Sequence, residues 1–100
     1  MGLDLCAKGH DGLHISYGGF FGVRTAIAEA IDGVLDVDLA ILLSHSDCDG
    51  ELTSKECKRI YKRLKDIEPE FEVDYHQEFY DAFRRMLKWC WKNKRTMHFC

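Results

Sequence analysis

Apolar and polar residues alternate in two short segments at the start of the chain. Residues 2–7 and 13–17 each carry an apolar side chain at every second position. The segment between them contains the pair Asp11 and Gly12. Period-two alternation on both sides of a glycine-containing turn is typical of a β-hairpin, so we expect two antiparallel strands here.

Apolar residues then recur every three to four positions from 23 to 31, after a glycine-rich stretch at 18–22. This pattern predicts a strand-to-helix turn followed by a first helix. Free N–H groups in such a turn can bind an anion, and Arg24 would lie nearby as a cationic ligand. Tight backbone packing is the commoner reason for short glycine motifs and is the alternative.

Two further helices are predicted around the middle of the chain. The first is short, has Asp36 or Asp38 as its N-cap and runs through Leu43. The second begins at a capping box, because Thr53 stands three residues before Glu56. Both helices therefore have side chains that can cap their first backbone N–H groups.

Pro69 stops that helix and separates it from a fourth, longer one. The fourth helix begins at Asp74, and its apolar side chains from Tyr75 to Cys90 have the i, i+4, i+8 spacing of a buried face. Residues 96–100 alternate again and predict a third strand that joins the hairpin. The whole pattern predicts an α+β fold, in which a small three-stranded antiparallel sheet packs with three to four helices.

Composition supports one ordered domain covering residues 1–100. Apolar residues make up 46% of the chain and aromatic residues 12%, which is enough for a packed core. No apolar run approaches the roughly 20 residues of a membrane span, and the first residues lack the pattern of a secretory signal. The five cysteines are odd in number and include no Cys-x-x-Cys pair, which favours free thiols in a reducing compartment. We therefore expect a cytoplasmic protein without a membrane partner.

Groups with ligand or acid–base chemistry gather in one place, between residues 45 and 56. The rest of the chain has the pattern of ordinary core or solvated surface, so this stretch is the first candidate for a functional site. The residues expected to contact a ligand there are His45, Ser46, Asp47, Asp49 and Glu51.

The twelve residues 45–56 resemble the calcium loop of the EF-hand family. Such loops place oxygen ligands at the first, third, fifth, seventh, ninth and twelfth residues, with glycine sixth at a sharp turn. Gly50 stands at the sixth position. The resemblance implies a divalent cation, calcium in the first instance, bound by Asp47, Asp49 and Glu56 with His45 at the first position.

His45 departs from that pattern, in which the first ligand is an aspartate. An imidazole suits zinc better than calcium, and Cys48 would be a second zinc ligand. A hydrolase is another interpretation, in which Asp47 or Asp49 orients His45 as a general base. Cys48 would then be the nucleophile. A simple turn needs no ligand, because Asp47 and Asp49 can accept backbone N–H groups and Gly50 can supply a positive φ.

The run His-Ser-Asp-Cys-Asp-Gly-Glu at 45–51 is similar to a motif of a family of small bacterial and phage proteins. A looser similarity covers Ser16, Tyr17, Phe20 or Phe21, Arg24, Cys90 and Phe99. The resemblance implies a small intracellular α+β domain with a functional role for the loop. It implies no particular activity.

The end of the fourth predicted helix is strongly basic. Residues 84–95 contain six basic residues and no acidic one, although the whole chain has a formal net charge of -3. Cations neutralise phosphates and an exposed tryptophan offers a stacking surface, so nucleic acid is a candidate partner. The alternative is a solvated helix face. The residues expected to contact nucleic acid are Arg84, Arg85, Lys88, Trp89 and Lys92.

These patterns support three functions. The leading expectation is a non-enzymatic binding or accessory domain, phage-derived by its resemblance, whose 45–56 loop binds a small ligand, a cation such as calcium or zinc, or a protein partner. The first alternative is a nucleic-acid accessory protein that uses residues 84–95. The second is a small hydrolase centred on His45 and Asp47, so the sequence leaves enzymatic activity open.

Overall fold

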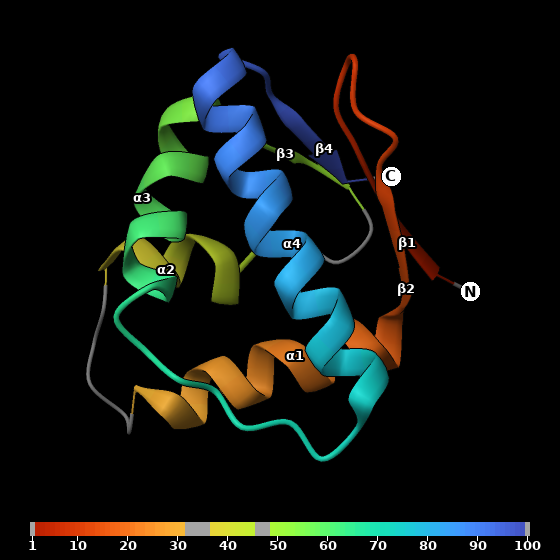
Figure 1. The fold of residues 1–100 in the computed structure, drawn as a ribbon, viewed down its shortest axis with the longest axis vertical. Helices are drawn as coiled ribbons and strands as arrows, with labels where there is room; N and C mark the ends of the chain where they lie inside the picture. Colours follow the sequence, from red (N-terminus) through yellow and green to blue (C-terminus); the bar gives the residue numbers. More distant parts are fainter. Residues whose placement is uncertain (1, 32–36, 46–48, 100) are drawn as a thin grey trace.

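The chain adopts the α+β arrangement expected from its hydrophobic pattern. The computed structural model describes residues 2–31, 37–45 and 49–99. Figure 1 shows the helices lying together on one side of the β1–β2 hairpin. In chain order the elements are β1 (Gly2–Cys6), β2 (Leu13–Ser16), α1 (Tyr17–Ala30), α2 (Val37–Leu43), β3 (Glu51–Leu52), α3 (Ser54–Leu64), α4 (Asp74–Asn93) and β4 (Met97–Phe99).

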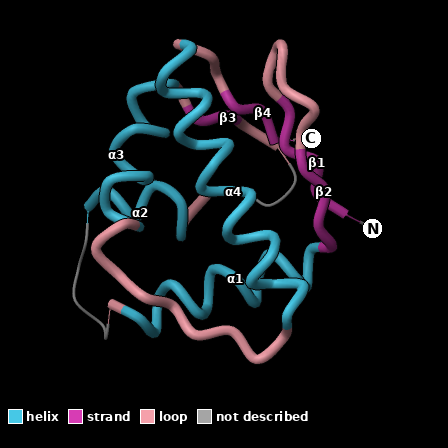
Figure 2. Tube along the Cα trace, in the orientation of Figure 1, coloured by secondary structure: helices cyan, strands magenta, loops and turns pink. Residues whose placement is uncertain are grey.

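The sheet of the described chain has four strands in the order β2-β1-β4-β3, with every neighbouring pair antiparallel (Figure 2). The expected hairpin and C-terminal strand are confirmed, and β4 pairs with β1 through Leu5 and Phe99. The expected number of three strands is wrong, because Leu52 pairs with Met97 and makes β3 a fourth strand. A two-residue strand is too short to show an alternating pattern, so the sequence did not reveal it.

Alternate residues of the sheet point into the core. Leu3, Leu5 and Ile15 are fully buried, whereas Asp4 and His14 lie on the other face and are exposed. The helices pack against the buried face, and a half-covered antiparallel sheet of this kind has one apolar and one polar side. The largest fully buried side chains from the helices include Phe20, Ile27, Leu39, Leu42, Ile60, Leu64, Phe83 and Met86.

The first helix begins earlier than expected. α1 starts at Tyr17 and includes the glycines of residues 18–22, so the expected turn at these glycines is wrong. Ser16 is the N-cap, and its Oγ accepts a hydrogen bond from the N–H of Gly19 at 3.0 Å. The glycine-rich turn that was a candidate for anion binding is therefore not formed.

Close packing explains why glycines occur inside α1. A Cβ atom at Gly19 would lie 2.8 Å from the Ile15 side chain, and one at Gly22 would lie 2.8 Å from the His76 ring. Both distances are shorter than van der Waals contact, so larger residues would push these neighbours away. Tight packing, the commoner reason for such glycines, is therefore the role they have here.

The second and third helices agree with the sequence except at their ends. α2 ends at Leu43 as expected, with Asp38 in its first turn, while Asp36 lies outside the described residues. α3 starts at the expected capping box but ends at Leu64, before Pro69 is reached.

The fourth helix begins at Asp74 as expected, and its buried face is confirmed from Phe79 to Cys90. Tyr75 is the exception, because it is 47% exposed. It lies in the first turn, where its hydroxyl donates to the carbonyl of His14 at 3.3 Å instead of entering the core. Among the described helices, none has the length and apolar character needed to cross a membrane.

Candidate functional site

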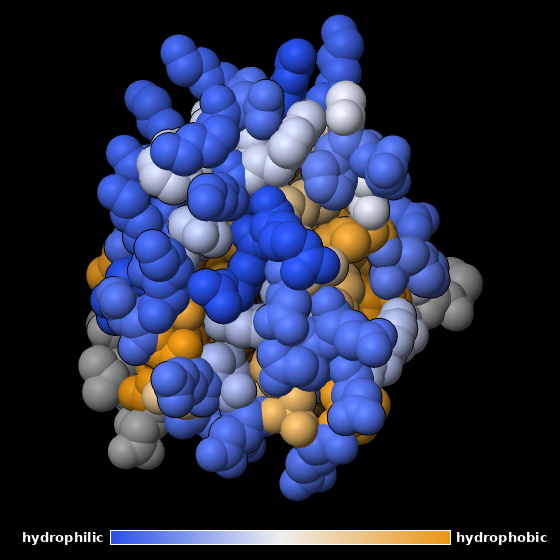
Figure 3. Space-filling model, viewed as in Figure 1, coloured by the Kyte–Doolittle hydropathy of each residue, from blue (hydrophilic) through white to orange (hydrophobic). Residues whose placement is uncertain are grey.

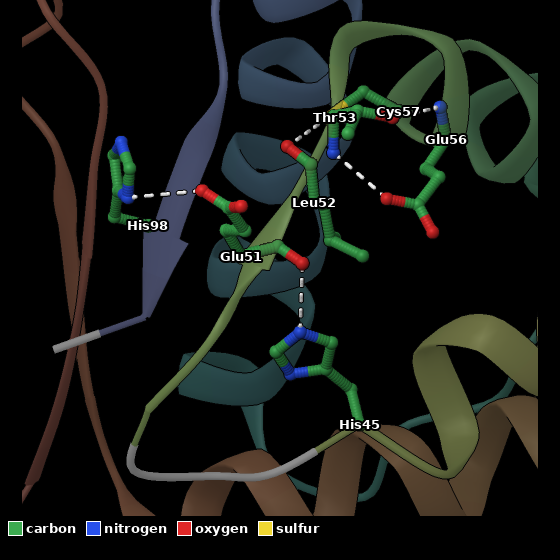
Figure 4. A network of polar contacts seen from close by, with 7 residues as sticks. All are labelled: His45, Glu51, Leu52, Thr53, Glu56, Cys57 and His98. Atoms are coloured by element: carbon green, nitrogen blue, oxygen red, sulfur yellow. Dashed lines mark hydrogen bonds and ion pairs between the residues drawn. The ribbon is translucent and has the colours of Figure 1, made fainter.

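His45 closes the turn between α2 and α3 (Figure 4). Its Nε2 lies 3.1 Å from the carbonyl oxygen of Glu51 and donates to it, because a carbonyl can only accept. The imidazole ring also packs on the ring of Phe99, with 4.0 Å between centroids. A role as general base would require His45 to release this hydrogen bond.

Gly50 has the positive backbone angle expected of a sharp turn, with φ of 96°. A Cβ atom there would lie 3.0 Å from Cε1 of His45, so glycine also makes room for the imidazole. The carbonyl of Gly50 accepts the N–H of Phe99 at 2.9 Å. The turn is thereby bonded directly to β4.

The acidic side chains after the turn have partners within the protein (Figure 4). Oε1 of Glu56 accepts the N–H of Thr53 at 2.9 Å, and Oγ1 of Thr53 accepts the N–H of Glu56 at 3.2 Å. This is the expected capping box. Oε2 of Glu51 lies 3.7 Å from Nδ1 of His98 on β4. Glu56, expected as a cation ligand, therefore caps α3.

The described residues do not assemble a calcium or zinc centre. Within residues 2–31, 37–45 and 49–99, no three His, Cys, Asp or Glu side chains come together in a way that could hold a metal ion. Asp49 is exposed, and the expected residues Ser46, Asp47 and Cys48 lie outside the described ranges. What is described of the loop has the contacts of a structural turn.

Arg24 connects α1 to the end of α2. Its Nη1 donates to the carbonyl of His45 at 2.5 Å and approaches the carbonyl of Leu42 at 3.4 Å. The guanidinium carbon lies 4.5 Å from the centroid of the Phe20 ring. Carbonyls at a helix C-terminus lack intrahelical partners, so Arg24 satisfies groups that α2 itself cannot.

Comparisons with known proteins identify no relative of this chain. No protein-family model, curated protein or solved structure matches the chain. The resemblance of residues 45–51 to a bacterial and phage motif, and of 45–56 to an EF-hand loop, stays a prediction.

A second candidate site lies where α3 and α4 run side by side. The Nζ atoms of Lys58 and Lys62 on α3 each lie 5.5 Å from the centroid of the Trp91 ring, and that of Lys92 lies 4.0 Å away. Tyr61 packs beside the same tryptophan, with 6.1 Å between ring centroids. Two helices thus bring three ammonium groups around one aromatic ring.

The cationic surface continues along α4 toward its middle. A cavity of about 290 Å³ is lined by Tyr61, Asp81, Arg84, Arg85 and Lys88. The Arg84 guanidinium lies 5.7 Å over the Tyr80 ring, and its buried Nε has no hydrogen-bond partner. Burial raises the pKa of the Tyr80 phenol, and the charge of Arg84 opposes this in part. We call the whole surface the basic face, made up of Lys58, Lys62, Arg84, Arg85, Lys88 and Lys92.

One acid, Asp81, lines the cavity at this surface, where its Oδ1 accepts a hydrogen bond from Gln77 at 3.1 Å. In the described part of the chain, none of the six cations of the basic face forms an ion pair. By contrast, Arg59 on α3 is 2.8 Å from Asp38, and Arg63 is 3.1 Å from Asp66. Figure 3 shows hydrophilic side chains covering the region over α3 and the C-terminal half of α4. The basic face is therefore free to meet an anionic partner.

Trp89 does not belong to the basic face. Its ring is half-buried and packs edge-on against His10 of the hairpin, with 5.1 Å between centroids. Trp91 falls within the basic stretch 84–95 identified from the sequence, but the sequence did not reveal that Lys58 and Lys62 join it in one site. Their only sequence signal is the i, i+4 spacing of the two lysines, which puts them on one side of α3.

Proposed function

We propose that this protein is an accessory domain that binds nucleic acid through the phosphate backbone, using the basic face. The observation that carries the proposal is the convergence of six cations from α3 and α4 with no ion pair to any of them among the described residues. Phosphates can neutralise such groups and release bound counterions, which favours association.

The arrangement favours contact with phosphates over reading of bases. The ammonium groups of Lys58, Lys62 and Lys92 lie near the Trp91 ring, where cation–π attraction keeps them close together. From Arg84 to Lys92 the helix advances by about 12 Å. Duplex DNA carries one charge per about 1.7 Å of its axis, so this length faces several phosphates. Binding is then independent of sequence and sensitive to salt.

The loop-centred function has weaker support. Three of its described polar side chains, His45, Thr53 and Glu56, form hydrogen bonds that build the turn and cap α3. In our proposal the described part of this stretch, residues 45 and 49–56, is structural and joins α3 to the sheet through β3.

The test is a salt titration of binding to a fluorescently labelled DNA duplex, followed by anisotropy. Affinity is expected to fall between about 50 mM and about 200 mM salt, with a logarithmic slope of about −0.9 for each phosphate contact. The double variant Lys58→Gln/Lys62→Gln removes two of these cations. Its slope should be smaller by about two, with weaker binding to every sequence tested.

Lys8→Gln/Arg59→Gln is the matched control, because it also removes two positive charges. Lys8 lies in the hairpin turn, and Arg59 is on α3 but is paired with Asp38. This variant should keep the wild-type slope. Absence of binding at about 50 mM salt, or an equal loss in both double variants, contradicts the proposal, since nonspecific attraction follows net charge rather than one face.

A further inference from the structure

The cavity between α3 and α4 has a charged wall and an aromatic wall. Asp81, Arg84, Arg85 and Lys88 have the i, i+3, i+4, i+7 spacing of one stripe along α4, and Tyr61 lines the cavity from α3. Its volume is about 290 Å³. Pockets for complete small ligands measure about 300–1,000 Å³, so this cavity suits a small group at the end of a larger molecule.

Arg84 has no anionic partner among the described residues. Its Nε is buried without a hydrogen-bond partner, and its guanidinium forms no ion pair there. The charge is delocalised over the planar group, so the missing partner leaves the whole cation less stabilised than it would be in water. The Tyr80 ring, 5.7 Å away, offsets this in part by cation–π attraction. An anion in the cavity would supply the missing charge.

The charges around the cavity suit an anion with more than one negative charge. Three cations and one carboxylate line it, which leaves two positive charges without compensation. A phosphate monoester carries about −1.5 to −2 charges at pH 7 and has three acceptor oxygens. A phosphate inside a nucleic-acid strand carries only one charge. The cavity therefore matches the phosphate at the end of a strand better than one in its interior.

Asp81 opposes an anion and so gives the site a built-in test. It stands one helical turn before Arg84 and Arg85, at the end of the stripe away from Lys88. Its Oδ1 accepts a hydrogen bond from Gln77 at 3.1 Å. Since like charges repel, removing this carboxylate should strengthen the binding of a phosphate in the cavity.

The cavity is continuous with the rest of the basic face. Tyr61 lines it and also packs beside Trp91, with 6.1 Å between ring centroids. The ammonium groups of Lys58, Lys62 and Lys92 lie around that tryptophan. A strand whose end occupies the cavity therefore continues directly onto these three cations.

We infer that this cavity binds the terminal phosphate monoester of a nucleic-acid strand, so that the protein prefers strand ends to the strand interior. Arg84, Arg85 and Lys88 contact the phosphate oxygens, and Tyr61 forms the wall facing the sugar that follows. A 5′-phosphate and a 3′-phosphate are the two forms of this group. The inference rests on the proposed function, because the basic face holds the remainder of the strand.

The experiment compares one duplex in three forms, with hydroxyl ends, with 5′-phosphates and with 3′-phosphates, each carrying the same internal fluorophore. At about 150 mM salt, anisotropy should show that one phosphorylated form binds about tenfold more tightly than the hydroxyl form, as one added charge-assisted contact provides. Arg84→Gln should reduce this ratio to about twofold or less. Lys88→Gln should do the same, and its exposed position keeps the core intact.

Asp81→Asn should change the ratio in the opposite direction. The amide keeps an Oδ1 that can accept the hydrogen bond from Gln77 but loses the negative charge, so the ratio should rise by about threefold. Loss of the ratio in this variant would contradict the inference. A general disturbance of α4 would weaken the ratio in all three variants, whereas the proposed site predicts opposite signs.

Lys58→Gln/Lys62→Gln is the matched control, because it removes two cations of the basic face outside the cavity. It should weaken the binding of every form and keep the tenfold ratio. Equal binding of all three forms by the wild type, with the salt slope intact, would overturn the inference and leave the proposed function standing. A ratio that survives both Arg84→Gln and Lys88→Gln would also overturn it, and absence of binding by every form would contradict the proposed function as well.

Discussion

The three described cysteines differ in how much of their surface solvent can reach. Cys57 on α3 and Cys90 on α4 are thiols without exposed surface, as expected for free cysteines, whereas Cys6 is exposed on β1. A hydrogen bond with Cys90 and burial both raise the pKa of Cys57. The same hydrogen bond lowers the pKa of Cys90, so protonation protects Cys57 alone, whereas burial protects both thiols.

The protonated state of Cys57 makes folding stability depend on pH. The unfolded chain releases this proton near pH 8.5 and the folded protein retains it, so the folded state binds more protons at higher pH. The contribution of Cys57 to the free energy of unfolding is therefore complete below about pH 8.5. It decreases as pH rises, by about 1 kcal/mol between about pH 8.5 and about pH 9.5. Urea unfolding under reducing conditions measures this. Cys57→Ser, which has no thiol to ionise, should show a correspondingly smaller decrease, and equal decreases would contradict the assignment.

At the scale of helices and strands, the sequence predicted a boundary correctly where the residues that fix it are close together in the chain. The capping box of Thr53 and Glu56 is local, and it was predicted correctly. The start of α1 was not, because the glycines at 18–22 have the composition of a turn and are kept for packing against residues far away in the sequence. The two-residue β3 exists only through its pairing with β4, which no local pattern encodes.

Only part of the basic face was predicted, because some of its residues meet only through the packing of two helices. Its α4 residues form one run in the sequence and were identified from it, whereas Lys58 and Lys62 join them only because α3 packs beside α4. Trp89 was assigned to the site by proximity in sequence, although the helix turns its ring toward the hairpin. Side chains at successive helix positions point in different directions, so a run of residues is not yet a surface.

Arg24 provides a test of how α1 and α2 are connected. Arg24→Gln should lower the free energy of unfolding by about 2 kcal/mol, because hydrogen bonds to charged groups contribute more than neutral ones. Arg24→Lys should recover only part of this, since a single ammonium lacks the planar fork of the guanidinium. Urea unfolding measures both.

Arg59→Gln is the control, because it removes an exposed ion pair with Asp38 of α2 and should lower the free energy of unfolding by less than about 1 kcal/mol. Equal costs for Arg24→Gln and Arg59→Gln would remove the structural role assigned to Arg24.

For the molecule as a whole, charge is separated along the second half of the chain. Residues 66–81 contain seven acidic and no basic residues, and residues 84–95 contain six basic and no acidic ones. The change occurs within α4, with acids near its N-terminus and bases near its C-terminus, which also suits the helix dipole. An acidic protein can therefore present a cationic face, because three of these seven acids lie in the first half of α4 and the other four lie in the segment before it.

The C-terminal strand β4 connects the N-terminal hairpin to the middle of the chain. β4 lies between β1 and β3, and its Phe99 packs on Phe20 of α1, with 6.0 Å between centroids, as well as on His45. Phe99→Ala should lower the free energy of unfolding by about 3–5 kcal/mol, the usual cost of deleting a buried aromatic ring. Phe21→Ala is the matched control, because that ring is 68% exposed and its loss should change stability by less than about 0.5 kcal/mol.

Urea unfolding of both variants, followed by circular dichroism and by tryptophan fluorescence, decides whether β4 supports the entire fold. Helix content reports on α1 to α4, while the fluorescence comes from Trp89 and Trp91 on α4 alone. If β4 joins one cooperative unit, Phe99→Ala should shift both transitions together to lower urea. Transitions that separate would mean that the sheet can open while α3 and α4 stay packed. In that case the basic face would not need the strand. Nucleic-acid binding should then survive the substitution at urea concentrations at which the fluorescence, sensitive to the packing of Trp89 on His10 of the hairpin, has changed and the helix content has not.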